Sequence, residues 1–197
     1  YAGTSGGGGV SAGKDSLLLI RNRVRIQHNK CGGKGGGVEL EGATMFLSHN
    51  STVAFNTAGH VGLSVRGSGK HGGGIAAWGG ATLSLFADVR MHGNHAVEQG
   101  GGVFIETGKS SSGVSFSARN DVIFESNSCG THGGGVAAIH IGRRGGDSMD
   151  MSDTIVRGNK AGHSGGGIAM ASGTLLLSNI TMDDNHASAS GGGGLRG

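Results

Sequence analysis

The chain has 197 residues, 45 of them glycine and none of them proline, and its formal net charge at pH 7 is +3. A collagen-like chain is excluded because there is neither a Gly-X-Y period nor proline, and a disordered linker is disfavoured because linkers do not hold apolar residues in fixed register with asparagine. The mild charge and few aromatic residues argue against a nucleic-acid partner, and the longest aliphatic run, Leu17 to Ile20, is far shorter than the roughly 20 residues of a membrane-spanning helix.

One sequence unit recurs along the chain. Each unit has an apolar residue, an asparagine three residues later, a polar loop, and a glycine cluster that opens onto another apolar residue, as in residues 91–103. Self-similarity at a period of 20 to 50 residues is typical of a solenoid. The apolar residues that follow the glycine clusters lie 27 to 37 residues apart and are Val10, Val38, Ile75, Val103, Val136, Ile168 and Leu195.

We expect three short strands in each unit. The first follows the glycines and has apolar residues at alternate positions, as at 103–105, and the second repeats this pattern, as at 83–85. The third ends three residues before the asparagine, as at 89–91, and is weaker at 51–53 and 154–156, where one position is polar. Between the second and third strands lies a polar corner of residue types that tolerate left-handed backbone, containing Asn22, Asn50, Asp88, Asn120, Asp121, Asp153 and Asn179.

This pattern predicts an all-β protein, a single-stranded right-handed parallel β-helix in which one unit makes one coil. We expect about six coils of 27–37 residues with three short strands per coil, in one solenoid domain of residues 1–197; the handedness follows from the usual chirality of parallel crossovers. A β-sandwich is the alternative, but it does not place an asparagine at one fixed site per repeat. We expect the asparagines to stack about 4.8 Å apart as a structural ladder, formed by Asn29, Asn56, Asn94, Asn127, Asn159 and Asn185.

The paired glycines before an aliphatic residue, alternating with Phe-x-x-Asn, carry a family resemblance. The chain resembles the chlamydial polymorphic outer membrane proteins and related β-helix adhesins along nearly its whole length. It differs in detail, because Gly-Gly-Gly-Val or Gly-Gly-Gly-Ile replaces Gly-Gly-Ala-Ile and only Phe124-Glu-Ser-Asn127 keeps the Phe. The resemblance implies a secreted protein, outside the cell or at its surface, with an adhesive or structural role. Our leading hypothesis is that this structural or adhesive protein has neither a catalytic site nor a cofactor.

A carbohydrate-active enzyme, a polysaccharide lyase or a glycoside hydrolase, is the alternative hypothesis because many secreted β-helices belong to that class. Such an enzyme needs carboxylates that converge on one outer face, as an acid–base pair or as Ca²⁺ ligands. Two residues before the ladder, Glu125 and Arg157 instead indicate a surface charge ladder. The candidate acids are Asp147, Asp150 and Asp153, with Asp183 and Asp184 in the next coil.

The histidines and cysteines give weaker predictions. His60, His132 and His163 precede glycine clusters on one side of the rod, where a solvated loop is favoured over a zinc site. Cys31 and Cys129 follow ladder asparagines three coils apart, so we expect about 14 Å between them, beyond the roughly 7 Å Cα separation that a disulfide tolerates. They are therefore expected to be free thiols or links to another chain.

Two N-glycosylation sequons, Asn50-Ser-Thr52 and Asn179-Ile-Thr181, fall in the polar corner. They predict glycans if the protein passes through a eukaryotic secretory pathway. The shared corner position favours an outward orientation for both asparagines.

The expected partners follow from the open strand edges of a solenoid. We expect copies of the protein stacked head-to-tail, or neighbouring repeats of the same chain, so that residues 1–197 are a segment of a longer chain or one subunit of a filament. A third hypothesis is a cell-surface adhesin segment whose insertion loops, residues 59–71 and 141–146, contact a receptor.

Overall fold

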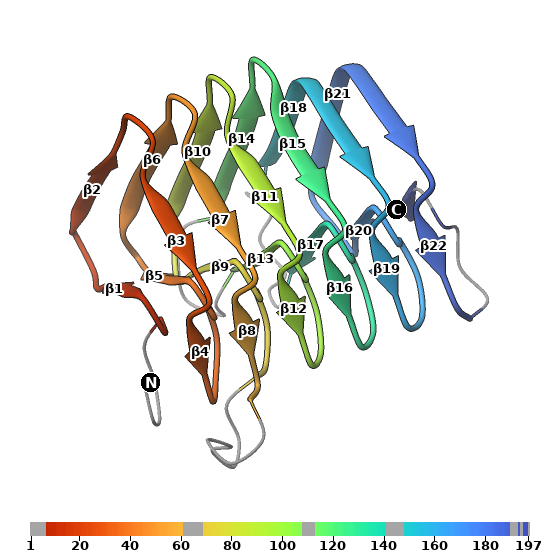
Figure 1. Ribbon diagram of the computed structural model, residues 1–197, viewed down its shortest axis with the longest axis horizontal. Helices are drawn as coiled ribbons and strands as arrows, with labels where there is room; N and C mark the ends of the chain where they lie inside the picture. The colour runs from red at the N-terminus through yellow and green to blue at the C-terminus, as the bar shows by residue number, and fades with distance from the viewer. Residues whose placement is uncertain are drawn as a thin grey trace.

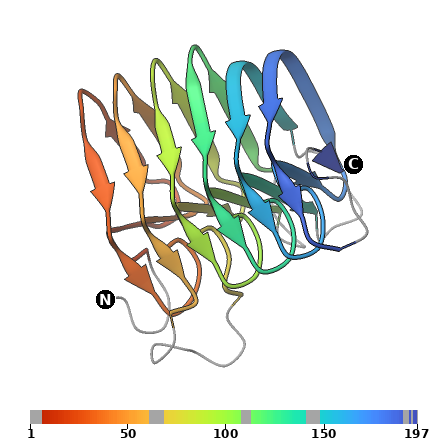
Figure 2. The same cartoon turned by 45° about the vertical axis from the view of Figure 1, so that its right-hand side comes forward.

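The fold is an all-β parallel β-helix. The computed structural model describes residues 7–60, 69–107, 113–140, 148–189, 193 and 195–196, and these residues form strands, turns and bends without a helix. Successive coils lie side by side along one axis (Figure 1), and the oblique view of Figure 2 shows the same stacking. In Figure 1 the coils advance from left to right while the chain rises at the back and descends at the front, which makes the helix right-handed. Residues 61–68 of the predicted insertion loop 59–71, and all of the predicted loop 141–146, lie outside the described residues.

Three sheets of parallel strands run along the axis. The first sheet consists of β1 (Val10–Ala12), β5 (Val38–Glu41), β9 (Ile75–Trp78), β13 (Val103–Thr107), β17 (Val136–His140), β20 (Ile168–Met170) and β23 (Leu195–Arg196). The second sheet consists of β2 (Leu17–Ile20), β6 (Thr44–Ser48), β10 (Thr82–Phe86), β14 (Ser115–Arg119), β18 (Ser148–Arg157), β15 (Val122–Glu125), β11 (Arg90–His92), β7 (Thr52–Ala54), β3 (Arg25–Gln27) and β21 (Thr174–Asp183). The third sheet consists of β4 (Lys30–Cys31), β8 (Thr57–Ala58), β12 (His95–Ala96), β16 (Ser128–Cys129), β19 (Lys160–Ala161) and β22 (His186–Ala187).

The division of each coil into strands differs from the prediction of three. The predicted second and third strands belong to one sheet that bends around the polar corner, and in the two coils of β18 and β21 they form a single ten-residue strand. The third sheet comes from two-residue strands that directly follow the ladder asparagine, such as β12. Two residues are too few to show an alternating pattern, so the sequence did not reveal this strand.

The core lies between the first and second sheets and is filled by the inward residues of each coil. In one coil, the inward residues Val103, Phe116 and Phe124 are at most 1% exposed, and the two phenyl rings meet edge-to-face with centroids 6.4 Å apart. Burial of a side chain of this size contributes about 1.5–3 kcal/mol. The inward rows therefore hold the coils together along the whole axis.

Polar residues at two inward positions are buried and hydrogen-bonded. Ser51 is fully buried, and its hydroxyl donates to the Ser48 carbonyl oxygen at 2.6 Å. Thr154 is 1% exposed, and its hydroxyl donates to the Ala118 carbonyl oxygen at 3.2 Å. The two weaker third strands of the sequence are thus real strands, because each polar group has a backbone partner.

The polar corner turns the chain through left-handed backbone. In the first four coils two consecutive residues have positive φ, for example 64° and 65° at Asn22 and Arg23. In the last two coils only one residue does, Asp153 at 49° and Asn179 at 50°, and there the strand continues through the corner. Asn and Asp are suited to this backbone, whereas Ala87, at φ 58°, is held there at a cost of about 1–2 kcal/mol.

The asparagine ladder forms as predicted and satisfies every amide group in its interior. The backbone N–H and the side-chain Nδ2 of Asn94 both donate to Oδ1 of Asn127, at 3.1 and 3.0 Å, and the same Nδ2 donates to the Val53 carbonyl oxygen of the preceding coil at 2.9 Å. Asn56, Asn127 and Asn159 repeat this pattern and all four are fully buried. Asn29 and Asn185 end the ladder and are half-buried.

Each glycine of the repeated triplet has its own physical reason. In the triplet before Val136, Gly133 has φ 70°, a conformation that residues with a side chain rarely adopt. A Cβ on Gly134 would lie 2.4 Å from the Gly166 carbonyl oxygen, and one on Gly135 would lie 2.7 Å from that of Gly167. The triplet is therefore where the coils approach one another through bare backbone.

Candidate functional site

The acids predicted to bind Ca²⁺ do not form a cluster in the described part of the chain. Asp150 projects from β18 and pairs with Arg119 of the preceding coil. Asp153 lies at the exposed corner, where its carboxylate accepts a hydrogen bond of 2.7 Å from the Asn179 side-chain amide. Asp147 lies outside the described residues. Within the described ranges, no three His, Cys, Asp or Glu side chains come together to hold a metal ion.

The three loop histidines are only partly brought together. His132 and His163 come from adjacent coils, and their ring centroids lie 5.8 Å apart. Nδ1 of His132 lies 2.7 Å from the Ser164 hydroxyl oxygen. His60 belongs to a coil two turns away from His132, so the three imidazoles do not share one site.

The two cysteines lie in one row of the third sheet, separated by three coil steps. The row runs from Cys31 through Ala58 and Ala96 to Cys129, as the spacing of the asparagines predicted. Both are buried free thiols. Burial raises the pKa of both thiols, that of Cys129 to about 11. Of the two predicted alternatives, the structure shows free thiols. A link to another chain would require the thiols to become accessible.

The two sequons lie where the sequence predicted them. Asn50 and Asn179 are exposed residues of the polar corner, with φ 57° and 50°. Both corners lie on the outside of the rod, so glycans attached there would not disturb the core.

A cluster of aromatic and charged side chains covers the outer face of the first sheet, and the sequence interpretation missed it. The Lys34 Nζ lies 4.6 Å from the Trp78 ring centroid and 5.8 Å from that of Phe104, and it pairs with the Glu106 carboxylate. The Trp78 Nε1 donates to the Glu39 carboxylate at 3.3 Å, and Glu39 is only 6% exposed. Sequence reasoning could not reveal the cluster, because Lys34 precedes a glycine cluster whereas Trp78 and Glu106 lie three residues beyond the first apolar residue of their own units.

His71 extends this cluster. Its ring stacks on Phe104 with centroids 4.2 Å apart, and its Nε2 lies 3.3 Å from the Glu98 carboxylate. Its Nδ1 is buried without a hydrogen-bond partner among the described residues. Burial lowers the pKa of His71, and Glu98 opposes that shift. Burial therefore disfavours the charged form of this imidazole.

Charged residues on the outer face of the second sheet confirm the predicted charge ladder. The Glu125 carboxylate accepts hydrogen bonds from Nε of Arg90 and Nε of Arg157, each at 3.1 Å. The hydrogen bond from Arg90 is the main reason that the pKa of Glu125 is lowered. Both arginines are about half exposed, so each pair contributes roughly 0–1 kcal/mol.

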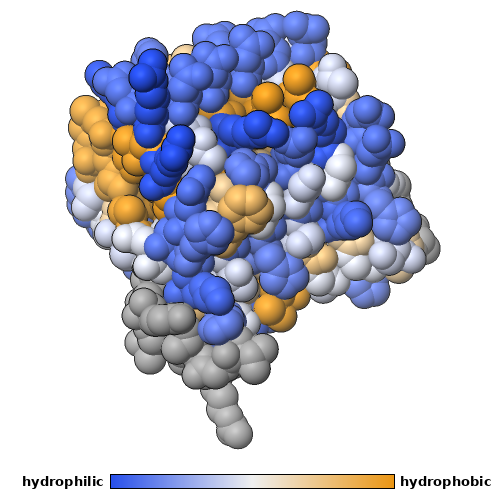
Figure 3. All heavy atoms as spheres, viewed as in Figure 1, coloured by the Kyte–Doolittle hydropathy of each residue, from blue (hydrophilic) through white to orange (hydrophobic). Residues whose placement is uncertain are grey.

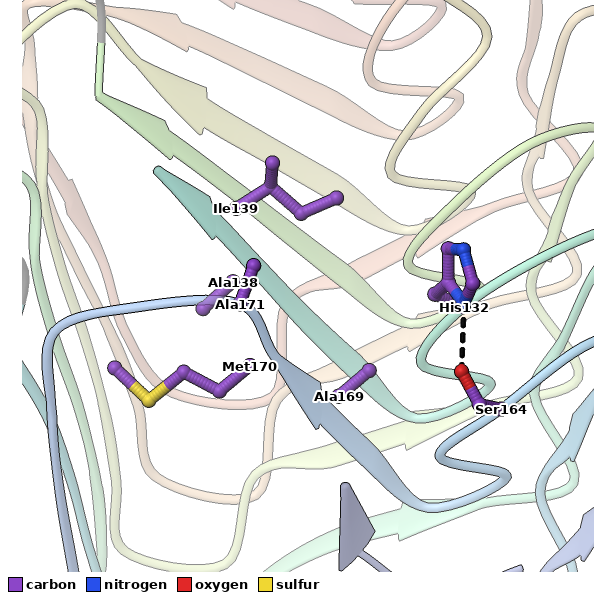
Figure 4. A pocket seen from close by; sticks show the side chains of 7 residues that line it. All are labelled: His132, Ala138, Ile139, Ser164, Ala169, Met170 and Ala171. Carbon is purple, nitrogen blue, oxygen red and sulfur yellow. Dashed lines mark hydrogen bonds between the residues drawn. The ribbon is translucent and has the colours of Figure 1, made fainter. Parts of the chain in front are cut away.

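A small hollow of about 290 Å³ lies on the outer face of the first sheet at β17 and β20 (Figure 4). Ile139 and Met170 lie on one side of it, and the hydrogen-bonded pair of His132 and Ser164 lies on the other. None of its described lining residues is Asp, Glu, Lys or Arg. Its size is at the lower limit of small-molecule sites, which are usually about 300–1,000 Å³. We assign it no ligand.

Comparisons with known proteins returned no match to a family model, to a curated protein or to a solved structure. Among the described residues there is also no helix long and apolar enough to cross a membrane.

Proposed function

We propose that the chain is an extracellular structural or adhesive module whose ends stack on further coils and whose outer faces make contacts. The resemblance to polymorphic outer membrane proteins supports a cell-surface location. The contrast between inside and outside supports the role, because the inward ladder repeats one residue type while the outward rows change from coil to coil. One such outward row reads Arg90, Ile123, Ile155 and Thr181. Varied outer rows on a constant interior are suited to presenting contacts along a rod.

One outward row of the second sheet carries the proposal of stacking. Three of the four coils between the ends have a polar residue in this row and one has Phe46, whereas Leu19 and Leu176 occupy it in the coils at the two ends and are 53% and 57% exposed. Figure 3 shows apolar surface over β2, the strand of Leu19. If two copies stacked in the register of the internal coils, Leu176 of one copy would pack on Leu19 of the next, and β1 of the next copy would take the place of β23 beside β20. The row consists of Leu19, Phe46, Ser84, Ser117, Asp150 and Leu176.

The asparagine ladder can continue across the same junction. Asn159 donates from its backbone N and its Nδ2 to Oδ1 of Asn185, at 3.1 and 2.9 Å. Asn185 would donate in the same way to Oδ1 of Asn29 in the next copy. Such a contact joins two different surfaces and does not close, so it propagates into a fibre. The next repeat of a longer chain would occupy the same face by the same contacts.

The test is the assembly state of the purified 197-residue protein. Sedimentation velocity and electron cryo-microscopy over a concentration series are expected to show rods that lengthen with concentration. Leu176→Asp should shorten them, because it places a charge in the apolar junction, whereas Ser117→Asp in the same row is the matched control and should leave them unchanged. A protein that stays monomeric at high concentration, or a Leu176→Asp variant that assembles like the wild type, would overturn self-stacking.

A carbohydrate-active enzyme is a second candidate because of one row on the first sheet. Glu41, Trp78 and Glu106 are in register on adjacent strands, so the two glutamates flank the indole about 10 Å apart at the backbone. Inverting glycosidases hold their two carboxyl groups about 6.5–9.5 Å apart. Against this reading, Glu106 is already paired with Lys34. Release of reducing ends from a polysaccharide panel that is abolished by Glu41→Gln would support the enzyme, and absence of release by the wild type would exclude it for those substrates.

A further inference from the structure

An exposed aromatic stack lies on the outer face where β3, β7 and β11 end. Phe55 is 48% exposed and lies between imidazoles of the two neighbouring coils. The His28 ring stacks on it, with centroids 5.2 Å apart and planes 12° apart, and the His92 ring meets it edge-on at 4.9 Å. Three rings from three successive coils thus form one continuous surface.

The backbone holds Phe55 in this position at a cost. It immediately precedes the ladder asparagine, and its φ of 54° is left-handed, which costs a residue with a side chain roughly 1–2 kcal/mol. The equivalent residue is Gly93 in the next coil and Ser126 in the one after, so the coil does not require an aromatic side chain there. The ring lies against Gly93, where an added Cβ would be 2.6 Å from the phenyl carbons. The neighbouring coil therefore leaves room for the exposed ring.

The surroundings of the stack are cationic. The segments that form this face in the first three coils, residues 21–30, 49–58 and 87–96, contain five arginines or lysines and a single acid, Asp88. Arg25 is exposed and Lys30 is half-buried, three residues before and two residues after His28 in the chain, whereas Arg90 pairs with Glu125. Figure 3 shows an apolar spot surrounded by hydrophilic side chains on this face, over β7 and β11. An aromatic surface bordered by cations suits a ligand that combines apolar ring surface with negative charge.

We propose that the surface of His28, Phe55 and His92, with Arg25 and Lys30, binds an acidic polysaccharide, with one sugar ring packed against the solvent-exposed side of this stack and a carboxylate or sulfate on the cations. The inference deepens the adhesive half of the proposed function and rests on it. A single exposed ring is far smaller than a stable protein–protein interface, which buries about 1,200–2,000 Å². Single-stranded nucleic acid also uses stacking and cations, but its bases stack on free aromatic faces, whereas the rings of this surface pack on one another.

The experiment measures binding of the whole 197-residue protein to four labelled probes by fluorescence anisotropy. The probes are a highly sulfated polysaccharide, a polyuronate, uncharged dextran and oligo-dT. We expect one or both acidic polysaccharides to bind, with affinity falling as salt rises, and dextran not to bind. Phe55→Ser should raise the Kd about tenfold, which corresponds to losing roughly 1.4 kcal/mol of apolar contact, and Arg25→Gln should raise it as well.

The matched control is Ile155→Thr. Ile155 lies on the same face, two coils beyond the stack, and threonine already occurs in its row at Thr52 and Thr181. Phe55→Ser should fold normally, because Ser126 occupies the equivalent left-handed position. Unchanged Kd in Phe55→Ser, failure of both acidic probes to bind, or tighter binding of oligo-dT would overturn the inference.

Adhesion of protein-coated beads to cells distinguishes this inference from the proposed function. Adhesion that persists in Phe55→Ser would place the adhesive contact elsewhere and overturn the glycan site alone. A wild-type protein that neither adheres nor assembles would overturn the proposed function itself.

Discussion

Asn127 connects three coils, and its replacement with alanine tests the asparagine ladder directly. Its Oδ1 accepts from the backbone N and the Nδ2 of Asn94, and its Nδ2 donates to the Met91 carbonyl oxygen at 2.9 Å and to Oδ1 of Asn159 at 3.1 Å. Asn127→Ala leaves two buried donors of Asn94 and the Met91 oxygen without these partners. At roughly 1–3 kcal/mol for each unsatisfied buried group, the expected loss is at least about 3 kcal/mol. That is a large part of the 5–15 kcal/mol that typically stabilises a domain.

The assay combines urea unfolding, followed by circular dichroism, with hydrogen exchange read by mass spectrometry. Exchange should accelerate first in residues 91–96, because the orphaned donors belong to Asn94. Asn120→Ala is the matched control: it removes an exposed corner asparagine at φ 60° and should cost no more than about 1–2 kcal/mol. An Asn127→Ala variant as stable as Asn120→Ala would refute the claim that the ladder stabilises the rod.

Four further predictions concern the coil and its packing. Gly134→Ala should cost more than about 3 kcal/mol or abolish soluble expression, because the new Cβ would lie 2.4 Å from a carbonyl oxygen of the next coil; normal thermal unfolding would contradict this. Ala87→Gly should raise stability by about 0.5–1 kcal/mol in thermal unfolding, since it removes left-handed strain, and a decrease would refute it. The pKa of His71 is lowered in the folded state, so stability should be full above the unfolded pKa near 6.5 and fall as pH drops below it; His71→Gln should flatten that dependence in urea titrations between pH 7 and 5. Cys129, with a thiol pKa of about 11 and little exposure, should resist a thiol reagent at pH 8 until urea unfolds the chain, and rapid labelling of native protein would contradict its burial.

The coil itself could be predicted from sequence because each coil repeats the same constraints. An inward residue must be apolar, the ladder residue must both donate and accept hydrogen bonds, and the triplet positions must lack a Cβ. These rows can therefore be recognised in the sequence alone. The prediction of strands failed where a strand was too short to show an alternation of apolar and polar residues. The strand His95–Ala96 has two residues, and nothing in two residues distinguishes a strand from a turn.

The outer faces were harder to predict because their contacts join different rows of different coils. Lys34 lies over Trp78 of the next coil and pairs with Glu106 two coils away, so the contact depends on side-chain reach across the stacking direction. The candidate acid Asp150 likewise pairs with Arg119 of the preceding coil rather than approaching Asp153. Each of these pairings depends on side chains from neighbouring coils, which the sequence of a single repeat does not contain.

At the position before the ladder asparagine, the requirements of the coil do not account for the residue type found. The fold requires left-handed backbone there, and Gly93 and Gly158 provide it without strain, at φ 61° and 60°. Phe55 takes the same backbone with an exposed, bulky ring, so it satisfies the coil less well than glycine does. A residue that is unfavourable for the backbone and contributes little to the core must be explained by what it presents outward. The same fold can carry unrelated functions, and for this chain the outer face around Phe55 is therefore the surface on which a ligand should be sought.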